Sequence, residues 1–457
     1  MRKFLLLSCI CFGLYTVANA QEADSLAFRR IADDILTNGQ AYGNLRILCK
    51  QIGPRLSGSP QMVRAEKETF RMMKEMGADT VYLQDTKVPH WVRGEKETAW
   101  IAGSNGSKMP LRICALGNSM GTGTKGIKAK VVEVHSFDEL DALGEKGIKG
   151  RIVYFNVRFN PTHVVTTQGY FETTQYRWTG ASKAARYGAV GTVIRSLSSS
   201  IDDYPHTGGM GYNDSFPKVP AVAISTRDGD LLSDELQRNN SAELYFRTTC
   251  TTLPDAIGHN VVAELRGSEF PNEVITIGGH LDSWDLAEGA HDDGAGCVQT
   301  MELIRVFRKL GIRPKRTIRV VLFTDEENRG SGSNRYTAFA KAENKHHILA
   351  IESDAGGFTP RGFSLVADAD KLARLRSWMP LFIPYGVYAF EIGSAGADVE
   401  SLRALGATVG ELMPDSQRYF DHHHAANDKF EEVNKRELEL GAINMANLVY
   451  MVDKYGL

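Results

Sequence analysis

From about residue 255 to its end, the chain alternates short apolar segments with amphipathic ones, and this alternation is the strongest constraint on its fold. The apolar segments are continuous, which is typical of parallel strands buried on both faces. The segments between them carry apolar residues at helical spacing. The sequence therefore predicts an α/β fold with a mixed, largely parallel sheet covered by helices.

The predicted elements follow in regular order. Strands are expected at residues 273–277, 317–324, 347–352 and 407–413, and helices at 294–310, 333–342, 369–378 and 435–455. Helices at 25–36 and 62–76 and strands at 80–83 and 97–102 precede them. In open sheets of this kind, ligands bind beyond the carboxyl ends of the strands.

Residues 103–252 have a different character. Short strand candidates at 151–157, 191–194 and 219–225 surround one helix of small residues at 180–187, with glycine and serine turns between them. This stretch contains no cluster of His, Asp and Glu. We expect it to form a separate module of mixed sheet and helix.

Charge and composition exclude several classes of protein. The 457 residues include 53 Lys and Arg against 55 Asp and Glu, and no long run of like charge occurs, so nothing indicates binding to nucleic acid or to an anionic membrane. Apolar residues make up 42% and charged residues 24%, near the average for globular proteins.

The amino terminus has the pattern of a signal peptide. Arg2 and Lys3 precede an apolar run at 4–17, and Ala18 and Ala20 supply the small residues of a cleavage site, so residues 1–20 are predicted to be removed. A lipoprotein signal ending at Cys9 is the alternative, but only about four apolar residues would precede it. No later stretch reaches about 18 apolar residues, so the mature protein is expected in a periplasmic or extracellular space.

Six cysteines become four once the predicted signal peptide is removed. The sequence does not decide whether Cys49, Cys114, Cys250 and Cys297 pair, because four thiols allow three connectivities. Cys297 lies in an apolar helical pattern and is expected to be a core thiol.

Metal-binding side chains follow the predicted strands of the second half. They are His280 and Asp282, Asp292 and Asp293, Asp325 to Glu327, Asp354, and His422 to His424 with Asp428. Each group alone is ordinary in a surface turn, but all of them lie at strand ends or on the loops that follow, where the fold places its binding crevice. Imidazoles combined with carboxylates suit zinc, whereas the absence of clustered thiols argues against a closed structural zinc site.

The adjacent pair Glu326 and Glu327 indicates hydrolysis. Neighbouring side chains diverge, so one carboxylate can bind a metal while the other accepts the proton of a metal-bound water that attacks a carbonyl. General-base assistance of this kind contributes about two to four powers of ten in rate.

These motifs together resemble the di-zinc exopeptidases of the aminopeptidase and glutamate-carboxypeptidase family, most of all its plasma glutamate carboxypeptidase branch with bacterial relatives. The likeness covers nearly the whole mature chain. It implies a catalytic domain at 21–102 and 253–457, with a protease-associated domain inserted at 103–252. The turn at residues 53–59 also fits the family pattern.

The resemblance also implies two Zn²⁺ ions and their ligands. Asp292 would bridge the ions, His280 and Asp354 would complete one site, and Glu327 and His424 would complete the other. The choice of Asp292 and His424 over their neighbours rests on the family's spacing. The peptide bond after Asp292 is expected to be cis.

Further roles follow from the same resemblance. Glu326 matches the general base, and Asp282 would orient the ring of His280. His423 stands where several relatives carry a tyrosine, so it either donates an N–H to the oxyanion or packs in its loop. Asp398 is a candidate for contacting a substrate terminus, and Phe420 either walls the pocket or serves packing.

The function implied is an extracytoplasmic exopeptidase acting on dipeptides or short peptides, with carboxypeptidase or dipeptidase specificity. An aminopeptidase of the same family is the alternative, because the motifs contain no arginine cluster to receive a carboxylate. A catalytically silent binding protein and another hydrolase on the same scaffold are further readings. Relatives often dimerise, so a homodimer is one state to test.

Overall fold

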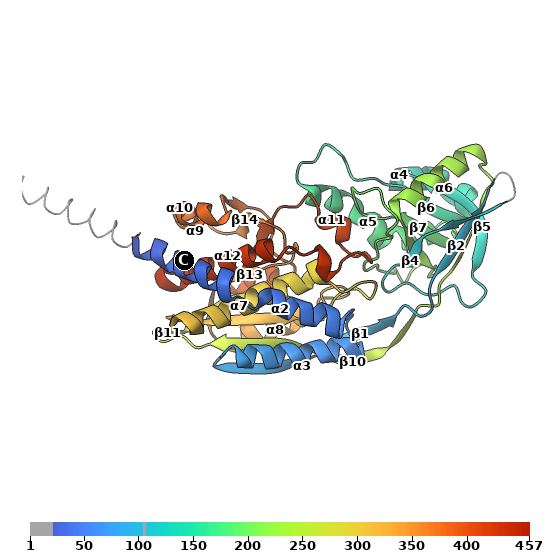
Figure 1. The fold of residues 1–457 in the computed structure, drawn as a ribbon. Coiled ribbons are helices and arrows are strands. Elements are labelled where there is room, and N and C mark those ends of the chain that lie inside the picture. Colours follow the sequence, from blue (N-terminus) through green and yellow to red (C-terminus); the bar gives the residue numbers. More distant parts are fainter. Residues whose placement is uncertain (1–21, 104–106) are drawn as a thin grey trace, which may run out of the picture.

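The structure, a computed structural model, describes residues 22–103 and 107–457. Its elongated shape comes from two lobes, each built around an eight-stranded sheet (Figure 1). The predicted signal peptide at 1–20 lies outside the described residues. Within the described part of the chain, no helix is both long and apolar enough to cross a membrane.

The first sheet is mixed, as predicted. Its order is β1, β10, β12, β11, β13, β16, β14, β15, and the four central strands β12, β11, β13 and β16 are parallel. The strands are β1 (Thr80–Val92), β10 (Thr251–Leu265), β11 (Phe270–His280), β12 (Arg316–Phe323), β13 (His346–Glu352), β14 (Pro360–Val366), β15 (Ala389–Ile392) and β16 (Thr408–Pro414).

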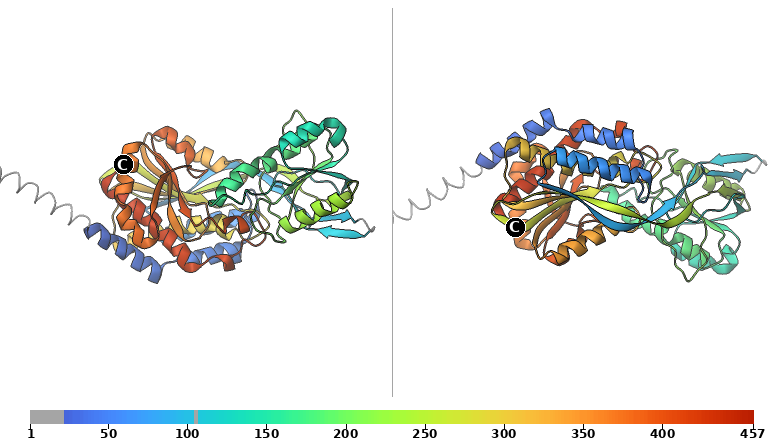
Figure 2. Two further views of the ribbon diagram at one scale, coloured as in Figure 1. Left: turned by 90° about the horizontal axis from the view of Figure 1, so that it is seen from above. Right: turned by 90° about the horizontal axis from the view of Figure 1, so that it is seen from below.

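Helices cover both faces of this sheet (Figure 2). One face packs against the helix that includes residues 22–38 and against α2, α3, α7 and α12, and the other against α8 and η4. The elements of this lobe are α2 (Ala41–Ile47), η1 (Leu48–Ile52), α3 (Pro60–Glu75), η2 (Ala290–Gly294), α7 (Ala295–Leu310), α8 (Ser331–Ala342), α9 (Ala369–Ser377), α10 (Met379–Phe382), η3 (Ile383–Tyr385), η4 (Glu400–Leu405), α11 (Tyr419–His422), η5 (Phe430–Glu432) and α12 (Lys435–Tyr455).

Helix α7 shows how the sequence fixes this core. Val298, Met301, Ile304 and Phe307 recur at helical spacing and are fully buried, so each contributes roughly 1.5–3 kcal/mol of burial free energy. Gly311 ends the helix with φ of +69°, a conformation that glycine adopts without steric cost. The amino-terminal end of α7, directly after η2, lies beside the loops that follow the strands.

The second sheet is formed within residues 98–247 and has its own cores on both faces. Its order is β3, β2, β9, β5, β6, β7, β8, β4. Its elements are β2 (Thr98–Ala102), β3 (Lys108–Leu111), β4 (Ile113–Ala115), β5 (Ile127–Val134), α4 (Phe137–Ile148), β6 (Ile152–Phe155), α5 (Thr166–Ala185), β7 (Gly191–Arg195), β8 (Ala221–Ile224), α6 (Thr226–Arg238) and β9 (Glu243–Arg247).

The two lobes are joined by the long antiparallel pair β1 and β10, and they meet again where α5 lies beside α11 (Figure 1). The division at residues 103 and 252 and its identity as a protease-associated domain stay a prediction. Cys49, Cys114, Cys250 and Cys297 are all buried and unpaired, and Cys297 lies in the core of the first lobe as expected.

Candidate metal centre

The parallel strands of the first sheet bring the predicted ligands to one edge. Strand β11 ends at His280, β12 is followed by Glu326 and Glu327, and β13 is followed by Asp354. Because these strands run in the same direction and are neighbours, their carboxyl ends lie together. All these residues except Glu326 and Asp354 are buried, and those two are partly exposed.

Asp292 lies at the centre of the cluster, and its two carboxylate oxygens face different partners. Oδ1 lies 3.2 Å from Nε2 of His280, which is itself 3.2 Å from Oδ1 of Asp354. Oδ2 lies 3.3 Å from Nε2 of His424, which is 3.0 Å from Oε2 of Glu327. This is the arrangement of one carboxylate shared between two three-residue sites.

The turn that carries Asp292 is held by two other carboxylates. Asp428 accepts the backbone N–H of His291 at 2.7 Å and of Asp292 at 3.1 Å. Asp293 accepts the N–H of His280 at 3.1 Å and of Gly296 at 2.9 Å. Asp293 is therefore occupied by backbone donors, and Asp292 is left to face the cluster. The peptide bond between them is cis, as expected.

The glutamate pair is positioned by Asp282. Its carboxylate accepts the backbone N–H of Glu326 at 3.2 Å and of Glu327 at 3.4 Å. The ring of His280 donates from Nδ1 to the backbone carbonyl of Asp282 at 3.0 Å, whereas the carboxylate of Asp282 lies 3.8 Å from that nitrogen. Asp282 thus contacts His280 mainly through its backbone and the glutamates through its side chain.

The charges of the cluster fit a bound cation. Burial raises the pKa of the carboxyl groups of Glu326, Glu327 and Asp354, and nearby carboxylates raise it further. One buried oxygen of Glu327 has no hydrogen-bond partner. A divalent cation among these oxygens would remove the repulsion and supply the missing contact, because such an ion is the largest local charge in its site.

Three successive histidines have three different surroundings. The ring of His422 stacks on His291 with centroids 5.2 Å apart, away from the cluster. His424 faces Asp292 and Glu327, as described above. His423 stacks on His424 at 3.6 Å, and its Nε2 lies 4.0 Å from Oδ2 of Asp292. Burial lowers the pKa of His423 to about 3, so its ring is neutral.

The predicted substrate residues lie at two places. Asp398 is buried beside Glu352, whose Oε2 accepts the Asp398 N–H at 2.9 Å. Phe420 stacks on Tyr170 at 5.0 Å and packs against Phe159, both in the second lobe. The contacts of Phe420 are therefore those of an aromatic cluster between the lobes.

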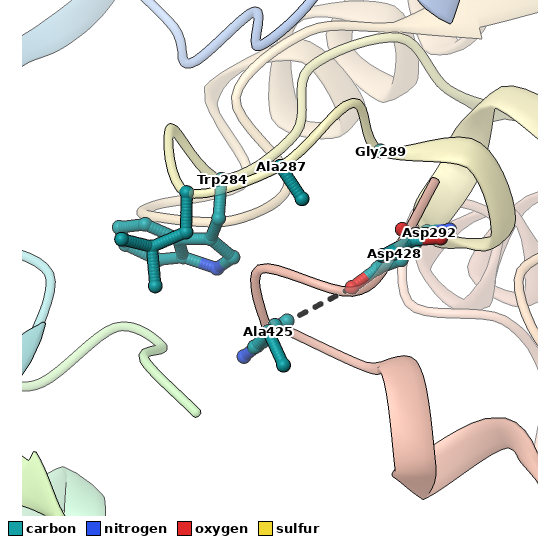
Figure 3. Close-up of a pocket in the computed structure, with 8 residues that line it drawn as sticks. Trp284, Ala287, Gly289, Asp292, Ala425 and Asp428 are labelled. Atoms are coloured by element: carbon teal, nitrogen blue, oxygen red, sulfur yellow. Dashed lines mark hydrogen bonds and ion pairs between the residues drawn. The ribbon is translucent and has the colours of Figure 1, made fainter. Parts of the chain in front are cut away.

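A small pocket opens beside Asp292 and His424 (Figure 3). Trp284 forms one wall, and Ala425 and Asp428 line the pocket next to His424. The indole of Trp284 also packs edge-on against the ring of His424, with centroids 5.8 Å apart. The pocket therefore borders the side of the cluster that carries His424.

Sequence reasoning assigned no role to Arg55, although it lies in the turn that fitted the family pattern. Its buried guanidinium donates to the carbonyl oxygens of Leu281 at 2.5 Å, Glu288 at 2.6 Å and Gly289 at 2.9 Å. It thereby holds the loop between His280 and the turn of Asp292. The only signal in the sequence was an arginine within a turn rich in glycine, proline and serine.

Known proteins resemble this chain along most of its length. The model of peptidase family M28 matches residues 260–449. Carboxypeptidase Q from Mus musculus is 35% identical over 413 residues, which cover 90% of this chain and 85% of that protein. The Homo sapiens carboxypeptidase Q is 34% identical with the same coverage.

Solved structures resemble the whole fold. A peptidase M28 precursor from Shewanella amazonensis has a TM-score of 0.90 and 31% identity, covering 95% of this chain and 97% of that one. An aminopeptidase from Aneurinibacillus sp. strain AM-1 has a TM-score of 0.62 and 22% identity, and the match covers 93% of this chain and 95% of that one. A zinc aminopeptidase from Bacillus subtilis shares the fold, with a TM-score of 0.64 and 17% identity. The match covers 90% of this chain and 94% of that one.

Proposed function

The chain belongs to peptidase family M28, as its motifs predicted, and on this premise we propose that it is a zinc-dependent exopeptidase with two Zn²⁺ ions bridged by Asp292. The observation that carries this proposal is the division of the Asp292 carboxylate between two partner sets, His280 with Asp354 and His424 with Glu327. Histidine nitrogens and carboxylate oxygens are the donors that catalytic zinc sites use.

The proposed chemistry divides among the chain's own residues. Zinc bound in this site would act as a Lewis acid, which makes water more acidic and polarises a carbonyl. Glu326 accepts the proton of the attacking water and passes it to the leaving amine. The partial exposure of its side chain suits contact with substrate, and Asp282 fixes its backbone.

His423 is proposed to stabilise the developing oxyanion. Its ring is neutral, and its Nδ1 has no hydrogen-bond partner among the described residues. A neutral imidazole can still donate one N–H, and a donor already in place needs no reorganisation during the reaction. Its position against His424 supports this role over simple loop packing.

The substrate is proposed to be a dipeptide or short peptide, cleaved with carboxypeptidase or dipeptidase specificity. The name of the relative that is 35% identical, carboxypeptidase Q, supports this choice. An aminopeptidase is the second candidate, because two structural relatives with the same fold are named aminopeptidases. A catalytically silent protein is disfavoured, because every proposed ligand and the base are present in this chain.

One assay separates these candidates. The purified protein is given the same dipeptide in three forms: unmodified, with the amino group blocked, and with the carboxyl group blocked. Cleavage of the amino-blocked form but not the carboxyl-blocked one supports a carboxypeptidase, and cleavage of the unmodified form alone supports a dipeptidase. Cleavage of the carboxyl-blocked form but not the amino-blocked one makes the protein an aminopeptidase. Failure to cleave any peptide after zinc is supplied contradicts the proposal.

We also propose that residues 1–20 export the protein to a periplasmic or extracellular space and that residues 103–252 form an inserted protease-associated domain. Amino-terminal sequencing of the mature protein would test the first point, since it should begin at Gln21.

A further inference from the structure

The second lobe reaches the proposed metal centre through Thr207. This residue is fully buried and lies between β7 and β8, at the junction with the first lobe. Its backbone carbonyl accepts the Nδ1–H of His424 at 3.2 Å, and its backbone N–H donates to the carbonyl of His424 at 2.9 Å. Two hydrogen bonds therefore join one residue of the second lobe to one proposed ligand.

The carbonyl contact fixes the state of the imidazole. A carbonyl oxygen only accepts, so this contact favours a proton on Nδ1 of His424; Nη1 of Arg177, which can only donate, lies farther from the same nitrogen, at 3.4 Å. Nε2 is then the free lone pair, and it is the atom that faces Asp292 and Glu327. A partner on the far nitrogen that sets tautomer and ring orientation is what a metal-binding histidine requires.

The backbone of His424 also depends on this contact. Its φ is +63°, in the left-handed region that residues other than glycine rarely adopt. The N–H of Thr207 binds the carbonyl of His424 itself, and the neighbouring His206 donates from Nδ1 to the carbonyl of His423 at 2.7 Å. The second lobe thus holds consecutive carbonyls of the histidine turn.

Thr207 is in turn rigidly held in its own lobe. Its hydroxyl donates to the carbonyl of Ala115 at 2.8 Å, and the carbonyl of Gly208 accepts the N–H of Gly117 at 2.9 Å. Gly208 has φ of +136°, and a Cβ there would lie 2.5 Å from Cζ of the buried Arg177 on α5. The segment therefore has little room to move.

We propose that Thr207 is a positioning residue that completes the His424 half of the metal centre, so that the second lobe is a structural part of that site. This inference rests on the proposed function, because it requires two bound ions. It predicts that a disturbance of Thr207 lowers the affinity for the ion held by His424 and Glu327. The affinity for the ion held by His280 and Asp354 should be unchanged.

The test compares Thr207→Val with wild type in the full chain. Valine keeps the shape of threonine but removes the hydroxyl that anchors the segment to Ala115. Metal-free protein is titrated with Zn²⁺ against a chelating indicator, and thermal unfolding is recorded alongside. Valine keeps the backbone carbonyl and only loosens its segment, so we expect the affinity for the ion held by His424 to fall by about tenfold, the lower end of the range for loss of such a partner, while the other affinity is unchanged.

Gly208→Ala is the second variant, since its added Cβ would push against Arg177 and shift the same segment. The matched control is Thr69→Val on α3, which removes a buried hydroxyl that donates to the carbonyl of Ala65. The control should keep both zinc affinities even if its melting temperature falls.

Two outcomes overturn the inference while the proposed function stands. In the first, both folded variants bind two ions with wild-type affinity. In the second, the affinities for both ions fall to the same extent. A wild type that binds fewer than two ions overturns the proposed function and this inference with it.

Discussion

The carboxylate of Asp282 accepts the backbone N–H of Glu326 at 3.2 Å, so a fully buried charge holds the proposed general base in place. Asp282→Asn replaces one acceptor oxygen by an amide NH₂, which would face a backbone N–H. We expect kcat to fall about 10- to 100-fold with the fold retained. Steady-state kinetics and circular dichroism would measure this, with the exposed Asp33→Asn as control. Wild-type kcat in Asp282→Asn would contradict the positioning role.

Glu326→Gln tests the base itself. Glutamine has nearly the same shape but does not accept the proton, so turnover should fall at least about a hundredfold while zinc content is unchanged. Zinc content is measured by elemental analysis alongside kcat. The exposed Glu75→Gln on α3 is the matched control and should behave as wild type. Full activity in Glu326→Gln would reject the assigned base.

Much of the first lobe was predictable because its strands are continuously apolar. The predicted strand at 317–324 is observed as β12, and the predicted helix at 435–455 matches α12 to the residue. Helix α5 was recognised only at its end, from residue 180, although it begins at Thr166. Before residue 180 its buried residues are Gly169, Thr173 and Arg177, which give no apolar periodicity.

Strands β1 and β10 show a different limit. β1 was predicted to end at residue 83 but extends to Val92, and its partner β10 was not predicted. The first residues of β10 are exposed and mix polar with apolar side chains, and they are held by pairing with β1 instead of by burial. Pairing of segments about 170 residues apart leaves no local pattern.

In the metal centre, too, some residues were predictable from the sequence and some contacts were not. Side chains such as His280 and Asp292 were found because they follow apolar strands. The contact of Thr207 with His424 is made by a backbone carbonyl, which every residue carries, so no residue type marks it. Likewise, residue type does not separate Asp292 from Asp293: the choice of Asp292 rested on the family's spacing, and the structure adds that the oxygens of Asp293 bind backbone N–H groups.

Glu302 on α7 predicts a dependence of stability on pH. Burial raises its pKa from 4.5 to about 7, although Arg305 opposes the shift. The folded state therefore binds this proton more tightly than the unfolded state. The contribution of Glu302 to stability is greatest below pH 4.5, is lost as the pH rises to about 7, and is constant above.

The comparison with Glu302→Gln isolates this contribution, because glutamine does not titrate. Between pH 4 and pH 8, the unfolding free energy of wild type should fall relative to the variant by about 3 kcal/mol. Urea unfolding at constant ionic strength would measure it. A difference that is independent of pH, or that favours wild type as the pH rises, would show that the Arg305 ion pair outweighs burial.

We propose that one carboxylate, Asp292, is shared by two metal ions. The most direct measurement is the titration of chelator-treated, metal-free protein with Zn²⁺, for wild type and for Asp292→Asn. We predict two ions per wild-type chain, recovery of peptidase activity with zinc, and weaker binding of both ions in the variant. A single ion in wild type, activity that persists after verified metal removal, or an Asp292→Asn variant that binds both ions normally would contradict it.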